Sequence, residues 1–253
     1  MEPRRLSRVQ VPEPFRIESD QIVAELPHAR AVFTTARGGV STGPYDSLNL
    51  GMLTDDDPSN VDENRRRLGE HVGHPWRRFC YGRQVHGNRV RRATEPPSPE
   101  RPYTEEDGQA TALPDAAAIV FVADCLPILL AADGAVAALH GGWRPLAAGI
   151  VDEGVAALRD VGGSGPIVAA LGPSARGCCY EVSEEVHQPF AAYDARRGRN
   201  LDIAAVARAQ LEALGIEVHD VGICTICSER GMLFSHRRDK GVTGRQAGVI
   251  CRN

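Results

Sequence analysis

The stretch that decides the fold is AAIVFVADCLPILLAADGAVAALHGGWRP, residues 117–145. Its apolar runs AAIVFVAD and AVAAL are short and rich in Val, Ala and Ile, a pattern typical of buried strands. Asp133 and Gly134 predict a tight turn ahead of the last strand. The amphipathic run LAAGIVDEGVAALRD, residues 146–160, predicts a helix directly afterwards. This part of the chain therefore combines neighbouring strands with a helix.

Further helix and strand signals lie on both sides of this stretch. A helix begins at Pro58, with Asp57 as its N-cap, and continues through VDENRRRLGEHVG. A second amphipathic helix is predicted over residues 203–214, with Gly215 as its C-terminal stop. The segments LNLG, VGICTICS, MLFSHRRD and AGVICR are predicted as strands joined by polar turns. Many short strands with interspersed helices indicate the α/β (α+β) class.

Length and composition favour a single domain over residues 1–253. A chain of this length buries a substantial core, and no Ser/Gly-rich linker divides it. The proline-rich stretch of residues 94–108 is predicted to be an exposed loop between strands. The net charge of −4 and the pI of about 6.1 provide no broad basic surface, so nucleic acid is not an expected partner.

Cysteine usage and hydropathy indicate the compartment. No apolar run follows the basic N-terminus, and no 18 apolar residues occur in succession, so neither secretion nor membrane insertion is expected. The seven cysteines do not form a dense framework of the secreted type. The sequence therefore predicts a cytoplasmic protein with reduced thiols, and leaves the oligomeric state open.

Three residues in glycine-flanked or strand-end motifs are candidate metal ligands: His86 in QVHG, Cys125 in ADCLPILL and His140 in HGGWRP. Two imidazoles and one thiolate would give zinc three protein ligands and leave a fourth position open, as in catalytic sites. The spacings of 39 and 15 residues match no local zinc-finger pattern. From these residues alone, a buried cysteine and core histidines remain the alternative.

Arg65 is a candidate ligand-binding residue on the first helix. It lies four residues after Val61 and three before Leu68, so it shares the inward-facing side of the helix. An arginine in this position either extends past the core or reaches an anionic ligand. Helix periodicity leaves both interpretations open.

Two short motifs do not support the functions that they suggest. GVSTG has the GxSxG spacing of serine hydrolases, but the nucleophile elbow needs a strand before Ser41 and a helix after it, and Pro44 follows instead. CTIC, Cys224 to Cys227, has thioredoxin spacing but closes an apolar run rather than opening a helix. A redox role or a second metal site at CTIC remains the minor alternative.

The chain resembles the YfiH/YlmD laccase-domain family, which is also described as zinc-dependent purine nucleoside phosphorylases and as peptidoglycan editing factor-like. The resemblance extends through the ordered blocks TTARGGVSTGPYDSLNLG, QVHG, ADCLPILL, HGGWRPLAAGIV, LGPSARGCCYEV, CTICS and FSHRRDKGVTGRQAGVI. It implies a single αββα-like domain in which two mixed β-sheets pack as a sandwich flanked by helices. It also implies bound zinc and activity on purine nucleosides.

The resemblance assigns roles to individual residues. It implies that zinc is held by His86, Cys125 and His140, which form the catalytic centre, and that Asn49 and Arg65 line the substrate pocket. For Arg65 it favours ligand binding, because a guanidinium holds phosphate bidentately. Asp124, beside Cys125, is a further catalytic candidate that would orient a ligand or handle a proton. A strand-end aspartate that only accepts backbone hydrogen bonds is the alternative.

The block after His140 departs from the family pattern HAGWRG, because Gly141 and Pro145 stand in it. Trp143 and Arg144 are assigned to substrate binding, with the indole placed against the base. Pro145 is expected to push Arg144 toward extended backbone geometry. In a further departure, Ser174 replaces a family cysteine, which leaves the substrate range open.

The leading functional hypothesis follows from the resemblance. Zinc would polarise a bound water or phosphate oxygen. Attack of phosphate on the ribose C1′ of adenosine, inosine or methylthioadenosine would release the base, whereas attack of water on C6 of adenine would release ammonia. The partners would then be a purine nucleoside and phosphate.

Three other functions are alternatives. A hydrolase that edits peptidoglycan precursors would use Cys125 as its nucleophile and a histidine as base. A copper polyphenol oxidase is a weaker interpretation, because a multicopper cluster needs many imidazoles and the chain has eight scattered histidines and no HxH pair. A non-enzymatic wall-associated binding protein would be marked by loss of the ligands, yet all three are present.

Overall fold

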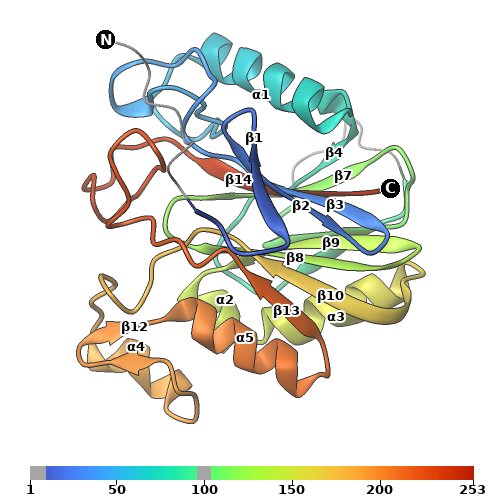
Figure 1. Ribbon diagram of the computed structural model, residues 1–253, viewed down its shortest axis with the longest axis vertical. Coiled ribbons are helices and arrows are strands. Elements are labelled where there is room, and N and C mark those ends of the chain that lie inside the picture. The colour runs from blue at the N-terminus through green and yellow to red at the C-terminus, as the bar shows by residue number, and fades with distance from the viewer. Residues whose placement is uncertain (1–9, 96–103) are drawn as a thin grey trace.

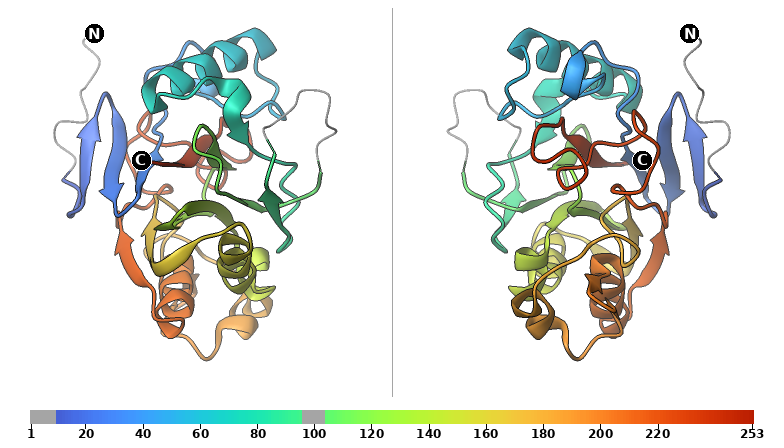
Figure 2. Two further views of the ribbon diagram at one scale, coloured as in Figure 1. Left: turned by 90° about the vertical axis from the view of Figure 1, so that its right-hand side faces the viewer. Right: turned by 90° about the vertical axis from the view of Figure 1, so that its left-hand side faces the viewer.

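Two six-stranded β-sheets pack face to face, and helices cover the outer face of each sheet (Figure 1). The structure is a computed structural model, and it describes residues 10–95 and 104–253. Two further views, each turned by 90° from Figure 1, show the same layers of sheets and helices (Figure 2). The predicted α/β sandwich flanked by helices is confirmed. Within the described residues, every helix is too short or too polar to span a lipid bilayer.

The first sheet contains both the first strand of the described chain and the last. Its strands are antiparallel except for one short parallel pair at the edge, β4 with β7. In spatial order they are β1 (Phe15–Glu18), β2 (Gln21–Leu26), β3 (Ala29–Phe33), β14 (Gln246–Arg252), β7 (Ala117–Val122) and β4 (Phe79–Cys80).

The second sheet contains residues 126–141 of the 117–145 stretch, as the strands β8 and β9. Its centre is the antiparallel hairpin β8–β9, which turns at Asp133 and Gly134. Gly134 has a φ of 83°, so the predicted turn requires a glycine there. In spatial order the strands are β13 (Glu217–Asp220), β10 (Ser164–Leu171), β8 (Leu126–Asp133), β9 (Ala135–Gly141), β6 (Gly108–Thr111) and β5 (Val90–Ala93). A separate two-stranded sheet consists of β11 (Arg196–Arg197) and β12 (Asn200–Leu201).

Helix α1 (Pro58–Val72) covers the first sheet, while α3 (Ile150–Asp160) and α5 (Ile203–Ala213) cover the second. The start of α1 is as predicted, because the Asp57 carboxylate accepts a hydrogen bond from the Ser59 N–H. The remaining helices within residues 10–95 and 104–253 are short. They are α2 (Trp143–Ala147), α4 (Glu184–His187) and the 3₁₀ segments Gly43–Tyr45, Trp76–Arg78 and Gln188–Phe190.

Strand β8 is apolar and buried from Leu126 to Ala132, because both of its faces are covered. Leu129 and Ala131 pack between the two sheets, whereas Ile128 and Leu130 face the layer of helices over the second sheet. Successive side chains of a strand point to opposite faces, so one strand fills two core layers. The apolar run without polar alternation therefore marks a strand covered on both sides.

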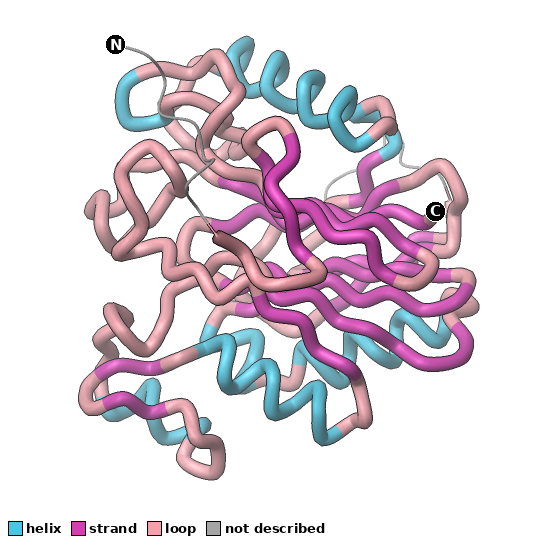
Figure 3. Tube along the Cα trace, viewed as in Figure 1, coloured by secondary structure: helices cyan, strands magenta, loops and turns pink. Residues whose placement is uncertain are grey.

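Three predicted strands are wrong: LNLG, VGICTICS and MLFSHRRD are loops, and only AGVICR is a strand, within β14. Side chains satisfy the backbone in these loops. The Gln246 amide bonds both the N–H and the carbonyl of Phe234, and Arg238 donates to the carbonyls of Leu233 and Thr225. Such long-range partners satisfy the backbone without a β-ladder. The loops of residues 34–57 and 221–245 gather at one end of the sandwich, on the left of Figure 3.

Candidate functional site

A cavity of about 710 Å³ lies at this end of the sandwich. Aromatic side chains and arginines from distant parts of the chain form much of its wall. The lining includes Arg65, Tyr81, Arg83, His86, Phe121, Cys125, His140, Trp143, Arg144, Tyr180, His236, Arg237 and Arg245. Cations beside aromatic faces suit a ligand with anionic and planar parts.

The chain crosses from the first sheet to the second between β7 and β8, and this crossing places Cys125 in the cavity. Asp124 has a φ of 91° at the sharp bend. His140 lies near the end of β9 and pairs in register with Pro127, so the antiparallel hairpin brings it beside Cys125. His86 arrives from the loop between β4 and β5, with a φ of 62°. Three separate segments thus meet at one point.

The side chains of His86, Cys125 and His140 have the arrangement of a metal site. Their ligand atoms all lie within 4.8 Å of one another, and Cys125 Sγ is 3.9 Å from His86 Nε2. Gly142 adjoins them, and a Cβ there would lie 3.2 Å from Cys125 Sγ and 3.3 Å from a carbon of the His86 ring. The glycine therefore leaves room for the group. This donor set can hold a metal ion with three protein ligands.

Asp107 supports this group from behind, and the sequence analysis did not identify it. Its Oδ1 accepts hydrogen bonds from the His86 N–H (2.9 Å) and His140 Nδ1 (2.7 Å), while Oδ2 accepts from the N–H groups of Val85 (3.1 Å) and Gly87 (2.7 Å). The carboxylate is fully buried. By binding Nδ1 it directs His140 Nε2 to a metal, the usual second partner of a histidine ligand. An acidic residue directly before a strand was the only sequence signal.

Electrostatics in the group favour a thiolate. Burial opposes ionisation of Cys125, but the charge of His140 and hydrogen bonds from both histidines outweigh it and lower the pKa of the thiol to about 6. Burial likewise opposes the charged form of His140, yet Cys125 and Asp107 raise the pKa of the imidazole to about 9. Cysteine binds metals and attacks electrophiles as the thiolate, so Cys125 is prepared for either role.

Asp124 lies against the cavity, but both oxygens of its carboxylate have partners. Oδ1 accepts from the Thr225 hydroxyl at 2.6 Å, and Oδ2 accepts from the Arg237 N–H at 2.7 Å. The side chain therefore connects the crossing between the sheets to the loop of residues 221–245. Its position next to Cys125 makes it a positioning group for that loop.

Arg65 is packed among core residues and also borders the cavity. The guanidinium is almost buried, and Nε donates to the Leu50 carbonyl at 3.0 Å. It also lies over three aromatic rings, with centroid distances of 4.7 Å to Trp76, 5.4 Å to Phe121 and 5.5 Å to Tyr81. At the same time Arg65 lines the cavity. The helix thus presents a firmly held cation to the cavity.

Asn49 lies behind the cavity wall and is fully buried. Its Nδ2 donates to the Thr54 hydroxyl and to Asp56, and its Oδ1 accepts from the N–H groups of Gly51 and Arg245. Gly51 and Arg245 line the cavity themselves. Asn49 therefore orients two parts of the wall.

Trp143 and Arg144 both line the cavity, from the start of α2. The Arg144 guanidinium lies 4.3 Å from the centroid of the Trp143 ring. The expectation that Pro145 makes Arg144 extended is wrong, because Arg144 is helical. Pro145 occupies the first turn of α2, where a proline needs no N–H partner and its φ suits a helix.

The loop of residues 221–245 and the segment after β10 supply cavity residues that the sequence analysis missed. Arg237, His236 and Arg245 come from the loop, and Tyr180 from the segment. The Arg237 guanidinium lies 5.1 Å from the Tyr180 ring centroid. Burial raises the pKa of Tyr180 to about 12, so its hydroxyl stays protonated. Only the HRRD run, with its density of charge, was a signal for any of them.

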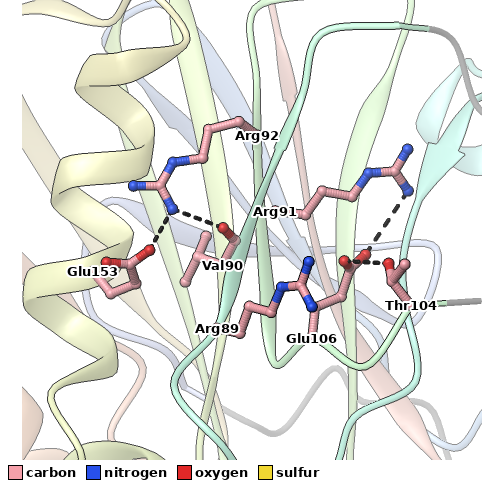
Figure 4. A pocket seen from close by; sticks show the side chains of 7 residues that line it. All are labelled: Arg89, Val90, Arg91, Arg92, Thr104, Glu106 and Glu153. Atoms are coloured by element: carbon pink, nitrogen blue, oxygen red, sulfur yellow. Dashed lines mark hydrogen bonds and ion pairs between the residues drawn. The ribbon is translucent and has the colours of Figure 1, made fainter.

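A second cavity, of about 590 Å³, lies beside β5 and is also lined by arginines (Figure 4). There, however, carboxylates pair with two of the three arginines. Arg92 forms ion pairs with Glu153 and Asp160, and Arg91 lies 3.8 Å from Glu106. The cavity that contains Cys125 is the better candidate for an anionic ligand, because it joins arginines to the metal-ligating group.

The fold and the site together define a family. Residues 30–253 match the family described as multi-copper polyphenol oxidoreductase laccase, and the chain belongs to it. Among curated relatives, a purine nucleoside phosphorylase of Streptomyces coelicolor is 40% identical over 86% of this chain and 93% of its own. The purine nucleoside phosphorylase YfiH of Escherichia coli is 37% identical over 92% of this chain and 98% of its own.

Solved structures agree with this placement. YlmD from Geobacillus stearothermophilus superposes with a TM-score of 0.84 at 32% identity, covering 96% of this chain and all of that one. The Neisseria meningitidis protein NMB0706 superposes with a TM-score of 0.80 at 32% identity, covering 93% of this chain. The resemblance to the YfiH/YlmD family found in the sequence is thereby confirmed.

Proposed function

We propose that this protein is a zinc-dependent purine nucleoside phosphorylase. The observation that carries the proposal is the group of His86, Cys125 and His140 in a cavity walled by arginines and aromatic rings. Both curated relatives described above carry this activity in their names. Adenosine, inosine and methylthioadenosine are the proposed substrates, together with inorganic phosphate.

The donor set fits zinc better than copper. Two imidazoles and one thiolate are common zinc ligands, and three protein ligands leave a position for water or substrate. Multicopper chemistry needs many more imidazoles, and this group contains two of the eight histidines. Bound zinc would act as a Lewis acid toward an oxygen of substrate or water.

The residues of the cavity suit phosphorolysis. Phosphate attacks C1′ of the ribose while the bond from C1′ to N9 of the purine breaks, so the enzyme must hold an anion beside a planar base. Arg65 and Arg237 present guanidinium groups for phosphate, and Trp143 and Tyr180 present aromatic faces for the base. Water in place of phosphate, directed to C6 of adenine, would give adenosine deamination in the same cavity.

One experiment tests the proposed function. The purified protein, after metal analysis, is incubated with each of the three nucleosides with and without phosphate, and products are separated by chromatography. We expect free base and ribose 1-phosphate, or its methylthio analogue, to form only when phosphate is present. Inosine formed from adenosine would identify the deaminase activity. Absence of both products from zinc-loaded protein would overturn the proposal.

Arg65→Lys is expected to lower phosphate-dependent turnover about tenfold or more, equivalent to about 1–3 kcal/mol for a charge-assisted hydrogen bond. Lysine keeps the charge but loses the planar fork and the stacking on Trp76. The measurement is kcat and the KM for phosphate. Arg66→Lys is the matched control, because Arg66 is exposed on the outer side of α1 and pairs with Glu63 and Glu70. Equal phosphate kinetics in both variants would assign Arg65 a purely structural role.

A thiol-dependent hydrolase that edits peptidoglycan precursors is the second candidate function. The observation that favours it is the lowered pKa of Cys125 together with the position of His86 Nε2, 3.9 Å from the sulfur. That pair resembles an activated nucleophile with its base. Hydrolysis of such an amide by metal-free protein would favour this function over phosphorolysis.

A further inference from the structure

Four further cysteines meet in a second group, away from Cys125. Cys178 and Cys179 lie in the segment that follows β10, and Cys224 and Cys227 lie in the loop that follows β13. Because β10 and β13 are parallel neighbours, the segments leave the sheet at the same edge. A bridge between Ser174 and Cys224 continues that pairing beyond the strands.

The sulfur positions match a tetrahedral thiolate site. All four Sγ atoms lie within 4.8 Å of one another, and those of Cys178 and Cys227 are 3.6 Å apart. Zinc–sulfur bonds of about 2.3 Å in a tetrahedron place the sulfurs about 3.8 Å from one another. A disulfide would require about 2.05 Å. The cysteines are therefore spaced as metal ligands rather than as bonded pairs.

Backbone N–H groups face the Cys224 sulfur. Those of Cys227 and Arg176 donate hydrogen bonds to it. The chain reverses tightly here, with the Ser228 N–H bonded to the Cys224 carbonyl at 3.1 Å. The CTIC segment is thus a tight turn that points two sulfurs at the same spot.

Arg176 lies beside these thiols. Its guanidinium pairs with Asp220 through two hydrogen bonds. The Arg176 Nε atom is buried and has no hydrogen-bond partner among the described residues. The pair with Asp220 balances the guanidinium charge, and the Nε–H remains as a buried donor beside the cysteines.

We propose that Cys178, Cys179, Cys224 and Cys227 bind a second, structural zinc ion. Four thiolates complete a tetrahedron and leave no open position, which distinguishes this site from the group at Cys125. On binding, zinc replaces the thiol protons and forms four Zn–S bonds, with no redox partner needed. This proposal depends on the positions of the four sulfurs and is independent of the proposed phosphorylase activity.

This zinc would hold one wall of the substrate cavity. Tyr180, which lines the cavity, follows Cys179 directly, and Thr225, which donates to Asp124, lies between Cys224 and Cys227. Fixing the four sulfurs joins the segment after β10 to the loop after β13. The site would therefore act on substrate binding through the position of the wall, without contacting substrate.

Zinc stoichiometry of the purified protein tests the proposal. We expect about two zinc ions per wild-type chain, one in Cys125→Ala and one in the double variant Cys178→Ser/Cys227→Ser. The control Cys251→Ala, in β14 outside both groups, should keep the wild-type content. If the four-cysteine site binds zinc but the Cys125 site does not, wild type and Cys125→Ala will each hold one zinc and the double variant none. Equal zinc in wild type and in a folded double variant would overturn the structural site.

Alkylation of the wild-type protein tests the four-cysteine zinc site even if the double variant does not fold. Cys178 and Cys227 are exposed, so as free thiols they would react with iodoacetamide at once. We expect peptide mass analysis to show them protected until a chelator removes zinc. Immediate modification of both cysteines would overturn the proposal. Protection lifted only by a reductant would also overturn it, since it would show a disulfide.

Discussion

Cys125→Ala is expected to remove the zinc held with His86 and His140 and to lower kcat/KM for phosphorolysis about a thousandfold. Loss of the sulfur leaves two imidazoles, too few to hold zinc firmly. A Lewis acid contributes several kcal/mol to transition-state stabilisation, and about 4 kcal/mol corresponds to a thousandfold in rate. Zinc content and steady-state kinetics with inosine and phosphate are the measurements.

The control for this variant is Cys251→Ala, which also removes a buried thiol, but from near the end of β14. It should keep zinc content and kinetics near wild type, apart from a modest loss of stability. Full activity in Cys125→Ala would remove this cysteine from the mechanism. Full zinc content combined with lost activity would instead favour the nucleophilic role of the thiol.

Asp107→Asn is expected to weaken zinc binding at the Cys125 site by about 10–100-fold. Each carboxylate oxygen of Asp107 accepts two hydrogen bonds, from His86 and His140 at one oxygen and from Val85 and Gly87 at the other. An asparagine retains only one of these acceptors, and its amide nitrogen would face two donors. Either His140 loses the partner of Nδ1 or the loop that carries His86 shifts.

Competition with a chelator measures the change in zinc affinity, and added zinc should restore part of the activity. Asp160→Asn is the matched control, because Asp160 is exposed and pairs with Arg92 far from the metal group. Its zinc affinity should equal that of wild type. An Asp107→Asn variant with wild-type affinity would show that the buried carboxylate serves folding alone.

The sequence allowed the core of the sandwich to be predicted. The apolar runs before Asp124 and His140 became β7 and β9, and the predicted turn and cap at Gly134 and Asp57 are observed. These signals are local, since turn chemistry, capping and side-chain periodicity act within a few residues. The predicted strands LNLG, VGICTICS and MLFSHRRD are loops, because remote side chains such as Gln246 bind their backbone, and no local pattern reports such partners.

The motifs around His86, Cys125 and His140 identified the metal-ligand candidates, and the family resemblance implied that the three meet, whereas the local sequence pattern gave no evidence of it. A separation of 39 residues carries no distance information, and only the crossing between sheets and the β8–β9 register bring the three side chains together. The same holds for Asp107 and for the four cysteines after β10 and β13. By itself the sequence determined the family, the central strands β7 and β9, and the local turn and cap signals. The tertiary structure alone decided which charges and sulfurs share a buried space, because those contacts depend on sheet pairing between distant segments.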